Sequence, residues 1–299
     1  MLATCPPHPR RLTMPSSSFQ TKALTTFLAI TVATWALIGC GRTAGGLTWL
    51  NGSTVAATQY YQGTEGLTGY ELKARLHLII RAALRLNYNQ TLIKLQFTDQ
   101  DDDHPDRVSM IYSGRSIAAV SDGADSRWNR EHIWAKVRGF PHADMIPYTD
   151  LHHLRACEIT VNSTRGSMDF GEVTAGRAVP EAPGVSYDAD LGVFEPSDEV
   201  KGDIARVLFY MDVRYQGGSA REPDLRLVEH LPANIRHGVD VDGNGYFANL
   251  STLIKWHERD PVDERESRRN DRVWQVQGNR NPFIDHPEFA RAVFAAANR

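Results

Sequence analysis

The chain has 299 residues, and its 41% hydrophobic and 23% charged content is ordinary for a globular protein. Its formal net charge of −3 argues against a protein that wraps nucleic acid in a strongly basic surface. That balance still allows an enzyme whose basic residues are local. The length admits one large domain or two small ones, and no internal repeat is visible.

Residues 1–40 have the pattern of a targeting segment rather than of a folded element. Basic residues precede an apolar run over 23–38, which has the length of a signal-peptide core. The run is shorter than a membrane span of roughly 20 residues. We therefore expect residues 1–40 to direct export from the cytoplasm.

The apolar run ends in Leu37-Ile38-Gly39-Cys40, which resembles a bacterial lipoprotein processing box. Cleavage before the cysteine would leave Cys40 to be lipidated, and the protein would be membrane-anchored outside the cytoplasm. The alternative is a periplasmic or secreted protein, cleaved near Ala44. Met14 is an alternative start of translation.

The three cysteines are Cys5, Cys40 and Cys157, so a mature chain without the signal has no disulfide framework. Cys157 lies close to His152 and His153, and a nucleophilic thiol has to be considered. We favour a small buried residue at this position.

Residues 41–58 are rich in Gly and Thr and predict a flexible tether before a domain over 59–299. Helical spacing of apolar residues predicts a helix over Thr68–Leu86, with Thr68 as N-cap and Glu71 completing a capping box. Residues 99–106 form an acidic loop that could hold Ca²⁺ or simply be solvated, and Val108–Tyr112 follows as a short strand.

The centre of the chain predicts a strand over Arg130–Trp134, a second over Leu154–Ala156, and a short helix entered from Glu158 to Asn162. Trp128 and Trp134 are expected in the core. Val173–Pro196 is rich in Pro and Gly and predicts a long surface loop.

The second half predicts mostly helices that pack on a small mixed centre, which makes the fold a single α+β domain. They cover Asp203–Tyr215, Leu250–Arg259, a segment capped by Asp260 that runs to about Gln277, and a last one opened by Pro287. Asp240–Gly245 matches the first half of a Ca²⁺-binding loop. Its twelfth position is Ser251 rather than Glu, so a tight turn explains the segment equally well.

Three short segments concentrate side chains suited to chemistry: Trp128–His132, Asp150–Arg155 and Val161–Gly166. An imidazole accepts a proton near neutral pH, and Glu and Asn oxygens suit a hard cation. Guanidinium groups suit phosphate oxygens. The combination favours metal-dependent phosphodiester hydrolysis. Basic residues gather in the same region: Arg127, Arg130, Lys136, Arg138, Arg155 and Arg165.

The same segments resemble the bacterial endonuclease I family, secreted or periplasmic non-specific nucleases of the His-Me finger (ββα-metal) class. Segments 201–215, 253–258 and 277–285 are also similar to family segments, so the resemblance runs from about Tyr60 to Phe289. It implies a ββα-metal core, two strands and a helix around one metal ion, within the helical domain.

The resemblance implies roles for four residues. His132 would be the general base, Glu131 and Asn162 would hold one divalent ion, and Arg165 would grip the phosphate or product. The ion would be Mg²⁺, with Mn²⁺ or Ca²⁺ as alternatives, and cleavage would leave 5′-phosphate ends. Adjacent strand residues point to opposite faces, so Glu131 and His132 can share a site only at a strand end or in a strongly twisted ribbon.

Four further residues are candidates for supporting the site or binding substrate: Arg130, Asp150, His152 and Arg155. The family often has Asn where this chain has His153. For Asp150 and His152 a structural hydrogen bond is an equal alternative.

The resemblance implies DNA and RNA as substrates. It does not rank them, or single against double strands, and the sequence is silent on oligomeric state and biological role. Two other functions stay open. A lipoprotein could bind nucleic acid without cutting, or a phosphodiesterase could act on small substrates, and digestion of a polymer separates these from a nuclease.

Overall fold

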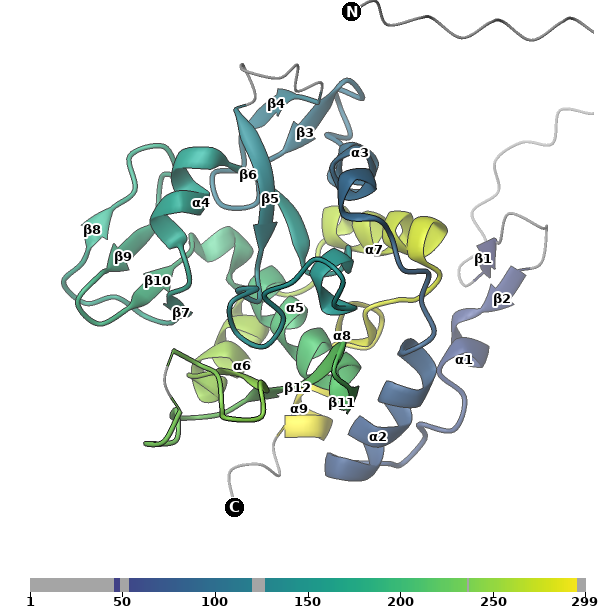
Figure 1. Ribbon diagram of the computed structural model, residues 1–299. Helices are drawn as coiled ribbons and strands as arrows, with labels where there is room; N and C mark the ends of the chain where they lie inside the picture. Colours follow the sequence, from purple (N-terminus) through teal and green to yellow (C-terminus); the bar gives the residue numbers. More distant parts are fainter. Residues whose placement is uncertain (1–45, 49–53, 120–126, 236, 295–299) are drawn as a thin grey trace, which may run out of the picture. The chain divides into compact units, whose positions relative to one another are not determined.

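A ribbon of two antiparallel strands carries the central motif (Figure 1). The computed structural model describes residues 46–48, 54–119, 127–235 and 237–294. Strand β5 (Trp128–His132) pairs with β6 (Leu154–Glu158), with Glu131 opposite Arg155 and His132 opposite Leu154. Helix α4 (Ile159–Arg165) follows β6 directly. The predicted strand, strand and helix are therefore present in the predicted order.

Helix α5 (Lys201–Arg214) lies at the centre of the domain and is buried along nearly its whole length. It packs against α2 (Gly69–Ile80), α6 (Leu250–Arg259) and α8 (Pro282–Asp285). Its charged side chains are tolerated because each is paired: Arg206 with Glu266, Asp212 with Lys73, and Arg214 with Glu222. The remaining helices are α1 (Ala57–Tyr60), α3 (Tyr88–Thr98), α7 (Glu264–Gln277) and α9 (Phe289–Phe294).

Three further small sheets surround this helical centre. Strands β3 (Arg107–Ser109) and β4 (Ser116–Ala118) form a hairpin. A four-stranded sheet has the order β7-β10-β9-β8, and a three-stranded sheet the order β11-β12-β13. Their strands are β7 (Asp169–Phe170), β8 (Arg177–Ala178), β9 (Ser186–Asp188), β10 (Val193–Glu195), β11 (Gln216–Ser219), β12 (Glu222–Leu227) and β13 (Gly245–Phe247).

These sheets confirm the α+β class but change two predictions. The segment Val173–Pro196 is not a plain loop, because it contributes β8, β9 and β10. The second half contains β11, β12 and β13 as well as its helices, so "mostly helical" was too strong a description. In the N-terminal region, β1 (Gly46–Thr48) and β2 (Thr54–Ala56) pair within the segment expected as a tether.

Helix α2 is shorter than predicted and lacks the predicted capping box. It starts after Thr68, but that side chain makes no capping hydrogen bond. The helix ends at Ile80 rather than Leu86, because the Asn279 side chain donates to the Ile80 carbonyl over 2.8 Å. A contact from the far end of the chain therefore sets this boundary.

Helix α7 begins three residues later than predicted. Asp263 is its N-cap and accepts from the Glu266 amide over 2.7 Å. Asp260, the predicted cap, instead accepts from the Gly202 amide at the start of α5 over 2.8 Å. Helix α6 has the predicted bounds.

The predicted signal segment, including the lipoprotein box and Cys40, lies outside the described residues. Within the described residues, no helix is both long and apolar enough to cross a membrane. Residues from Ala44 onward form one compact unit.

Candidate active site

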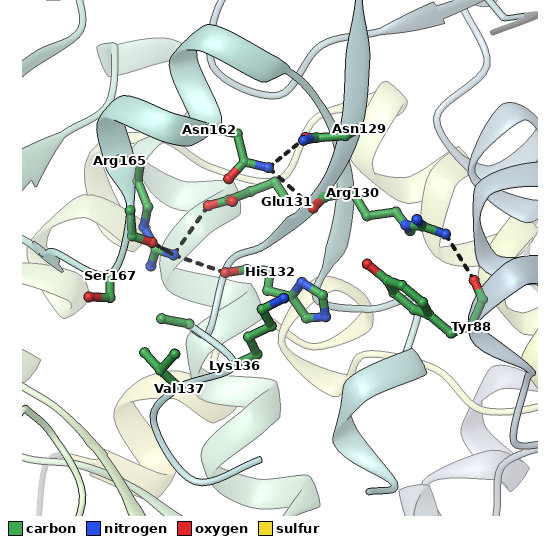
Figure 2. A pocket seen from close by; sticks show the side chains of 12 residues that line it. Tyr88, Asn129, Arg130, Glu131, His132, Lys136, Val137, Asn162, Arg165 and Ser167 are labelled. Carbon is green, nitrogen blue, oxygen red and sulfur yellow. Dashed lines mark hydrogen bonds and ion pairs between the residues drawn. The ribbon is translucent and has the colours of Figure 1, made fainter. Parts of the chain in front are cut away.

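A cavity of about 460 Å³ opens between the end of β5 and the C-terminal half of α4 (Figure 2). Its wall is mostly polar, and both signs of charge face into it. The residues that line it are Tyr88, Asn129, Arg130, Glu131, His132, Ala135, Lys136, Val137, Asn162, Arg165, Gly166 and Ser167. The predicted base and both predicted metal ligands are among them.

Glu131 and His132 both reach this cavity because β5 ends at His132. Within a regular strand their side chains would point to opposite faces. The chain bends at Ile133 and Trp134, directly after the end of β5. The strand-end alternative predicted from the sequence is thus the one that the structure adopts.

The Glu131 carboxylate is buried, with 2% of the residue exposed, and one of its oxygens has two partners. The Tyr112 hydroxyl donates to Oε1 over 2.7 Å, and Arg165 Nη1 lies 3.3 Å from the same oxygen. Burial raises the pKa of Glu131, while Arg165 and the Tyr112 hydrogen bond oppose that rise. These partners favour the ionised form that a metal ligand requires.

The Asn162 side chain is oriented by hydrogen bonds from its amide nitrogen. Nδ2 donates to Asn129 Oδ1 over 2.6 Å and to the Arg130 carbonyl over 3.2 Å. The oxygen of Asn162 is consequently directed toward the Glu131 carboxylate (Figure 2). Two oxygen acceptors that face each other fit a hard cation between them.

Within the described residues, no group of three or more His, Cys, Asp or Glu side chains is placed to hold a metal ion. The cavity offers one carboxylate, from Glu131, and one carboxamide, from Asn162, as oxygen donors. This set fits an ion such as Mg²⁺, which usually keeps several waters and takes few protein ligands.

His132 Nε2 lies 3.1 Å from the Tyr148 carbonyl oxygen. A carbonyl only accepts, so Nε2 carries the proton in the neutral ring and Nδ1 is the basic nitrogen. Nδ1 has no hydrogen-bond partner in the described part of the chain. Burial lowers the pKa of His132 well below its usual value, and His153 lowers it further. The ring is therefore neutral near pH 7 and able to accept a proton.

Arg165, predicted to grip the phosphate, lines the cavity with its guanidinium group engaged by the protein. Only 1% of the residue is exposed. Nη1 donates to the His132 carbonyl over 2.9 Å and Nη2 to the Ile133 carbonyl over 2.5 Å. The guanidinium thus ties α4 to the end of β5 and holds Glu131, which is a positioning role.

Two other cations line the cavity. Arg130 stacks on the Tyr88 ring at 3.8 Å and donates to the Tyr88 carbonyl over 3.0 Å. Lys136 donates to the Tyr148 hydroxyl over 3.2 Å. Arg130, a predicted substrate-binding residue, therefore lies at the cavity wall together with Lys136.

Asp150 and His152 do not line the cavity. Asp150 accepts from the hydroxyls of Tyr210 over 2.8 Å and Tyr215 over 2.7 Å, and from Gln277 over 2.8 Å. His152 Nε2 lies 3.1 Å from the Asn279 carbonyl, and burial lowers the pKa of His152 to about 4. Both belong to a buried network and fit the structural alternative.

Arg155 also lies away from the cavity, in contact with Asp99 over 3.0 Å. Arg269 contacts the same Asp99 oxygen over 2.6 Å. Asp102 of the acidic loop is paired with Arg268 and Arg272. Arginine guanidinium groups thus neutralise both of these acids.

The Asp240–Gly245 segment is a tight turn held by its own side chain. Asp240 Oδ1 accepts from the amides of Asp242 and Asn244, each over 2.9 Å. Its Oδ2 accepts from Asn244 Nδ2 over 3.0 Å and from the Tyr246 hydroxyl over 3.1 Å. The turn explanation accounts for the sequence pattern.

Cys157 is fully buried, and burial raises the pKa of its thiol well above the ordinary value. This confirms the small buried residue predicted from the sequence. Trp128 and Trp134 are likewise in the core.

Sequence reasoning missed the residues that orient the site from outside the motifs. Tyr112 binds Glu131 from a position 19 residues earlier. The Tyr148 backbone sets the protonation of His132, and no side-chain pattern marks a carbonyl. Asn129 stood inside the quoted motif, two residues before Glu131. Alternate residues of a strand share a face, so this spacing was a usable signal.

The comparisons with known proteins agree with this site. The family model described as Endonuclease I matches residues 68–288. An extracellular ribonuclease of Bacillus amyloliquefaciens is 45% identical over 240 residues, which cover 79% of this chain and 78% of the relative. An extracellular ribonuclease of Bacillus subtilis (strain 168) is 43% identical, with the same two coverages.

The chain therefore belongs to the endonuclease I family. It is a nuclease, an enzyme whose substrate is nucleic acid, and its family depends in general on a divalent metal ion.

Proposed function

We propose that this protein is a secreted, Mg²⁺-dependent endonuclease that hydrolyses RNA and DNA with little sequence preference. One observation carries the proposal. The oxygens of Glu131 and Asn162 face each other in the cavity that also contains the unpaired Nδ1 of His132. A protein that only binds nucleic acid gains nothing from this arrangement.

Glu131 and Asn162 are the residues that would hold the ion. A bound divalent ion stabilises negative charge on the leaving oxygen and orients the phosphate. Tyr112 and Arg165 keep Glu131 in place and ionised, and Asn129 keeps the Asn162 oxygen turned inward. The site is thus arranged before substrate arrives, so little reorganisation is needed.

His132 acts as the general base in this proposal. Its Nδ1 accepts a proton from a water molecule as that water attacks phosphorus, and the Tyr148 carbonyl stabilises the imidazolium that forms. The bond that breaks is between phosphorus and the 3′ oxygen, which leaves a 5′-phosphate end. Arg130 and Lys136 balance the charge of the phosphate diester at the cavity wall.

Substrate selectivity follows from what the site can read. The cavity offers cations for phosphates and no set of side chains that matches base edges, so contacts to the backbone dominate. The two relatives are named ribonucleases, which supports RNA as a substrate. We include DNA because a site that reads phosphates does not distinguish the sugars.

We propose an extracytoplasmic location, since both relatives are named extracellular. The apolar segment 23–38 supplies an export signal. Lipidation of Cys40 stays a prediction, and mass spectrometry of the N-terminal peptide tests it.

The test incubates the purified protein with supercoiled plasmid and with a long RNA. Each is assayed with Mg²⁺, with EDTA, and with the variants His132→Ala and His142→Ala, the latter an exposed histidine outside the cavity. We expect EDTA and His132→Ala to abolish cleavage, His142→Ala to leave it unchanged, and products to carry 5′-phosphates. If His132→Ala cuts as fast as the parent, the proposed base is wrong. If the folded parent cuts only small diesters, the polymer assignment fails.

A further inference from the structure

A second hollow, of about 260 Å³, lies at the start of β5 against the β3–β4 hairpin. Three arginines line it: Arg107 and Arg115 from the hairpin and Arg127 immediately before β5. Ser116 and Trp128 contribute polar and apolar wall, and no carboxylate is among the described residues that line it.

The three guanidinium groups are not equivalent. Arg107 is held in place, because its Nε donates to Ser116 Oγ over 2.9 Å and its Nη2 to the Ser116 carbonyl. Arg115 and Arg127 are exposed, and within the described residues neither guanidinium has a hydrogen-bond or ion-pair partner. Two unpaired cations and one fixed cation thus face the same hollow.

Two described carboxylates near the hairpin, those of Glu158 and Asp101, have partners other than Arg115 and Arg127. Glu158 accepts from Ser113 Oγ over 2.5 Å. Asp101 accepts from the Asp103 amide over 2.9 Å and lies 3.4 Å from His104 Nδ1, and a hydrogen bond with Ser116 lowers the pKa of Asp101. Among these groups, none binds Arg115 or Arg127, and the hollow keeps a positive balance that suits an anion.

The hollow and the catalytic cavity lie along one strand. Side chains at alternate positions of a strand share a face, which places Arg127, Asn129 and Glu131 on one side of β5. The pairing extends to Arg127, whose carbonyl accepts from the Ile159 amide over 3.2 Å. Four residues of strand span about 13 Å. A nucleic-acid strand in a helix rises about 3.4 Å per nucleotide, so this distance corresponds to about four nucleotides.

We propose that Arg107, Arg115 and Arg127 form a subsite for a backbone phosphate of the same polynucleotide, several nucleotides from the bond that is cut. This inference rests on the proposed nuclease function. It predicts that the enzyme selects substrates by chain length rather than by sequence. A substrate that is too short to reach the hollow gains nothing from it.

The test compares the parent with Arg115→Ala/Arg127→Ala, which removes the two exposed and unpaired cations. A matched control, Arg221→Ala/Arg259→Ala, removes the same charge from side chains that are 64% and 71% exposed elsewhere. A third variant, Arg115→Lys/Arg127→Lys, restores the charge. Substrates are a 20-nucleotide RNA and a nitrophenyl diester of thymidine.

We expect the Ala pair to raise KM for the 20-mer about 10-fold with kcat unchanged, because removing each charge-assisted hydrogen bond costs roughly a factor of three or more. The salt dependence of 20-mer affinity should become shallower by about 0.7 in slope, the value for one single-strand phosphate that is no longer neutralised. Cleavage of the small diester should not change. The Lys pair and the control pair should behave as the parent.

An unchanged KM for the 20-mer overturns the subsite, as does an equal loss on the small diester or an equal effect of the control pair. The salt slope is measured by fluorescence anisotropy in EDTA, where no cleavage is needed. A parent that binds but does not cut therefore contradicts the proposed function and leaves the subsite measurable. If the Ala pair loses binding to anionic vesicles while its KM for the 20-mer is unchanged, the hollow binds membranes and the proposal is overturned.

Discussion

Two polar clusters in this protein are built from nearly the same residue types and differ in what their free atoms face. The catalytic cavity has Glu131, His132 and Asn162, and the buried network has Asp150, His152 and Asn279. In the network, both Asp150 oxygens are occupied and Asn279 donates to Ile80 and Tyr210. In the cavity, the Asn162 oxygen and the His132 Nδ1 are turned to open space.

The difference teaches how a site is separated from a core. Each cluster uses a backbone carbonyl to hold a histidine: Tyr148 for His132 and Asn279 for His152. The His132 ring lines an open cavity, whereas the His152 ring packs on Tyr210 inside the buried network. Residue types alone do not distinguish an active site from a buried network. The distinction depends on where the second polar atom of each side chain is placed.

The largest expected effect separates the two histidines by their readouts. His132→Ala should lower the cleavage rate by about 10²–10⁴, the usual contribution of a general base, and leave the melting temperature nearly unchanged. His152→Gln should lower the melting temperature and leave the cleavage rate nearly unchanged. Single-turnover cleavage and thermal melts of both variants check this. Equal loss of rate in both would mean that the clusters act as one site.

Asp150→Asn should cost about 2–4 kcal/mol of unfolding free energy, because an amide placed among three donors leaves buried groups unpaired. Urea unfolding measures the loss. A destabilised variant that still cuts at parental rate below its melting transition supports a structural role. Loss of rate without loss of stability would instead make Asp150 part of the catalytic apparatus.

Tyr112→Phe should weaken metal activation by about 10-fold, since the hydroxyl holds a metal-ligating carboxylate. The rate at saturating Mg²⁺ should stay close to that of the parent. A Mg²⁺ titration of plasmid nicking gives both quantities. Tyr215→Phe, which removes a matching hydroxyl from Asp150, is the control and should not shift the titration.

The smallest effect is on the pH dependence of stability. Burial lowers the pKa of His152 and of His153 to about 4, below the unfolded value of 6.5. Between these values the unfolded chain binds protons that the folded chain does not, so stability falls as pH drops from about 6.5 toward 4. Burial alone would raise the pKa of Asp150, yet its partners hold that pKa below the ordinary value of 3.8. Asp150 therefore adds a further loss of folding stability when the pH falls below 3.8.

Urea unfolding at pH 7.5 and 5.5 measures this difference in stability. His152→Gln should make the difference smaller, because one of the buried imidazoles with a lowered pKa no longer titrates. An equal or larger difference in the variant would show that other groups dominate the acid loss.

The strand–strand–helix arrangement was implied by the family resemblance, and the structure has its three elements in that order, with β5 two residues earlier than the predicted strand Arg130–Trp134. Residues 128–132 and 154–158 pair directly, α4 follows without a gap, and α6 has an amphipathic pattern that begins and ends as predicted. The roles of Glu131, His132 and Asn162 came from a family resemblance, and their common location in one cavity agrees with it.

What the sequence did not predict depends on contacts between distant segments. The end of α2 is set by Asn279, and the start of α7 by the diversion of Asp260 to Gly202. Strand β10 pairs in parallel with β7 across more than twenty residues, and strands of two or three residues carry too short a pattern to identify. The burial of Arg165 could not be predicted for the same reason, because it depends on how α4 packs against β5.

The Tyr148 carbonyl that holds His132 has a consequence for how this enzyme tolerates mutation. The group is part of the main chain, so no codon change deletes it. The position of the proton on His132 therefore depends on the conformation of the Pro147–Thr149 turn and not on the identity of one side chain. Random mutagenesis should find few substitutions at position 148 that act through the base. An amide-to-ester replacement that weakens this one acceptor should reach it directly.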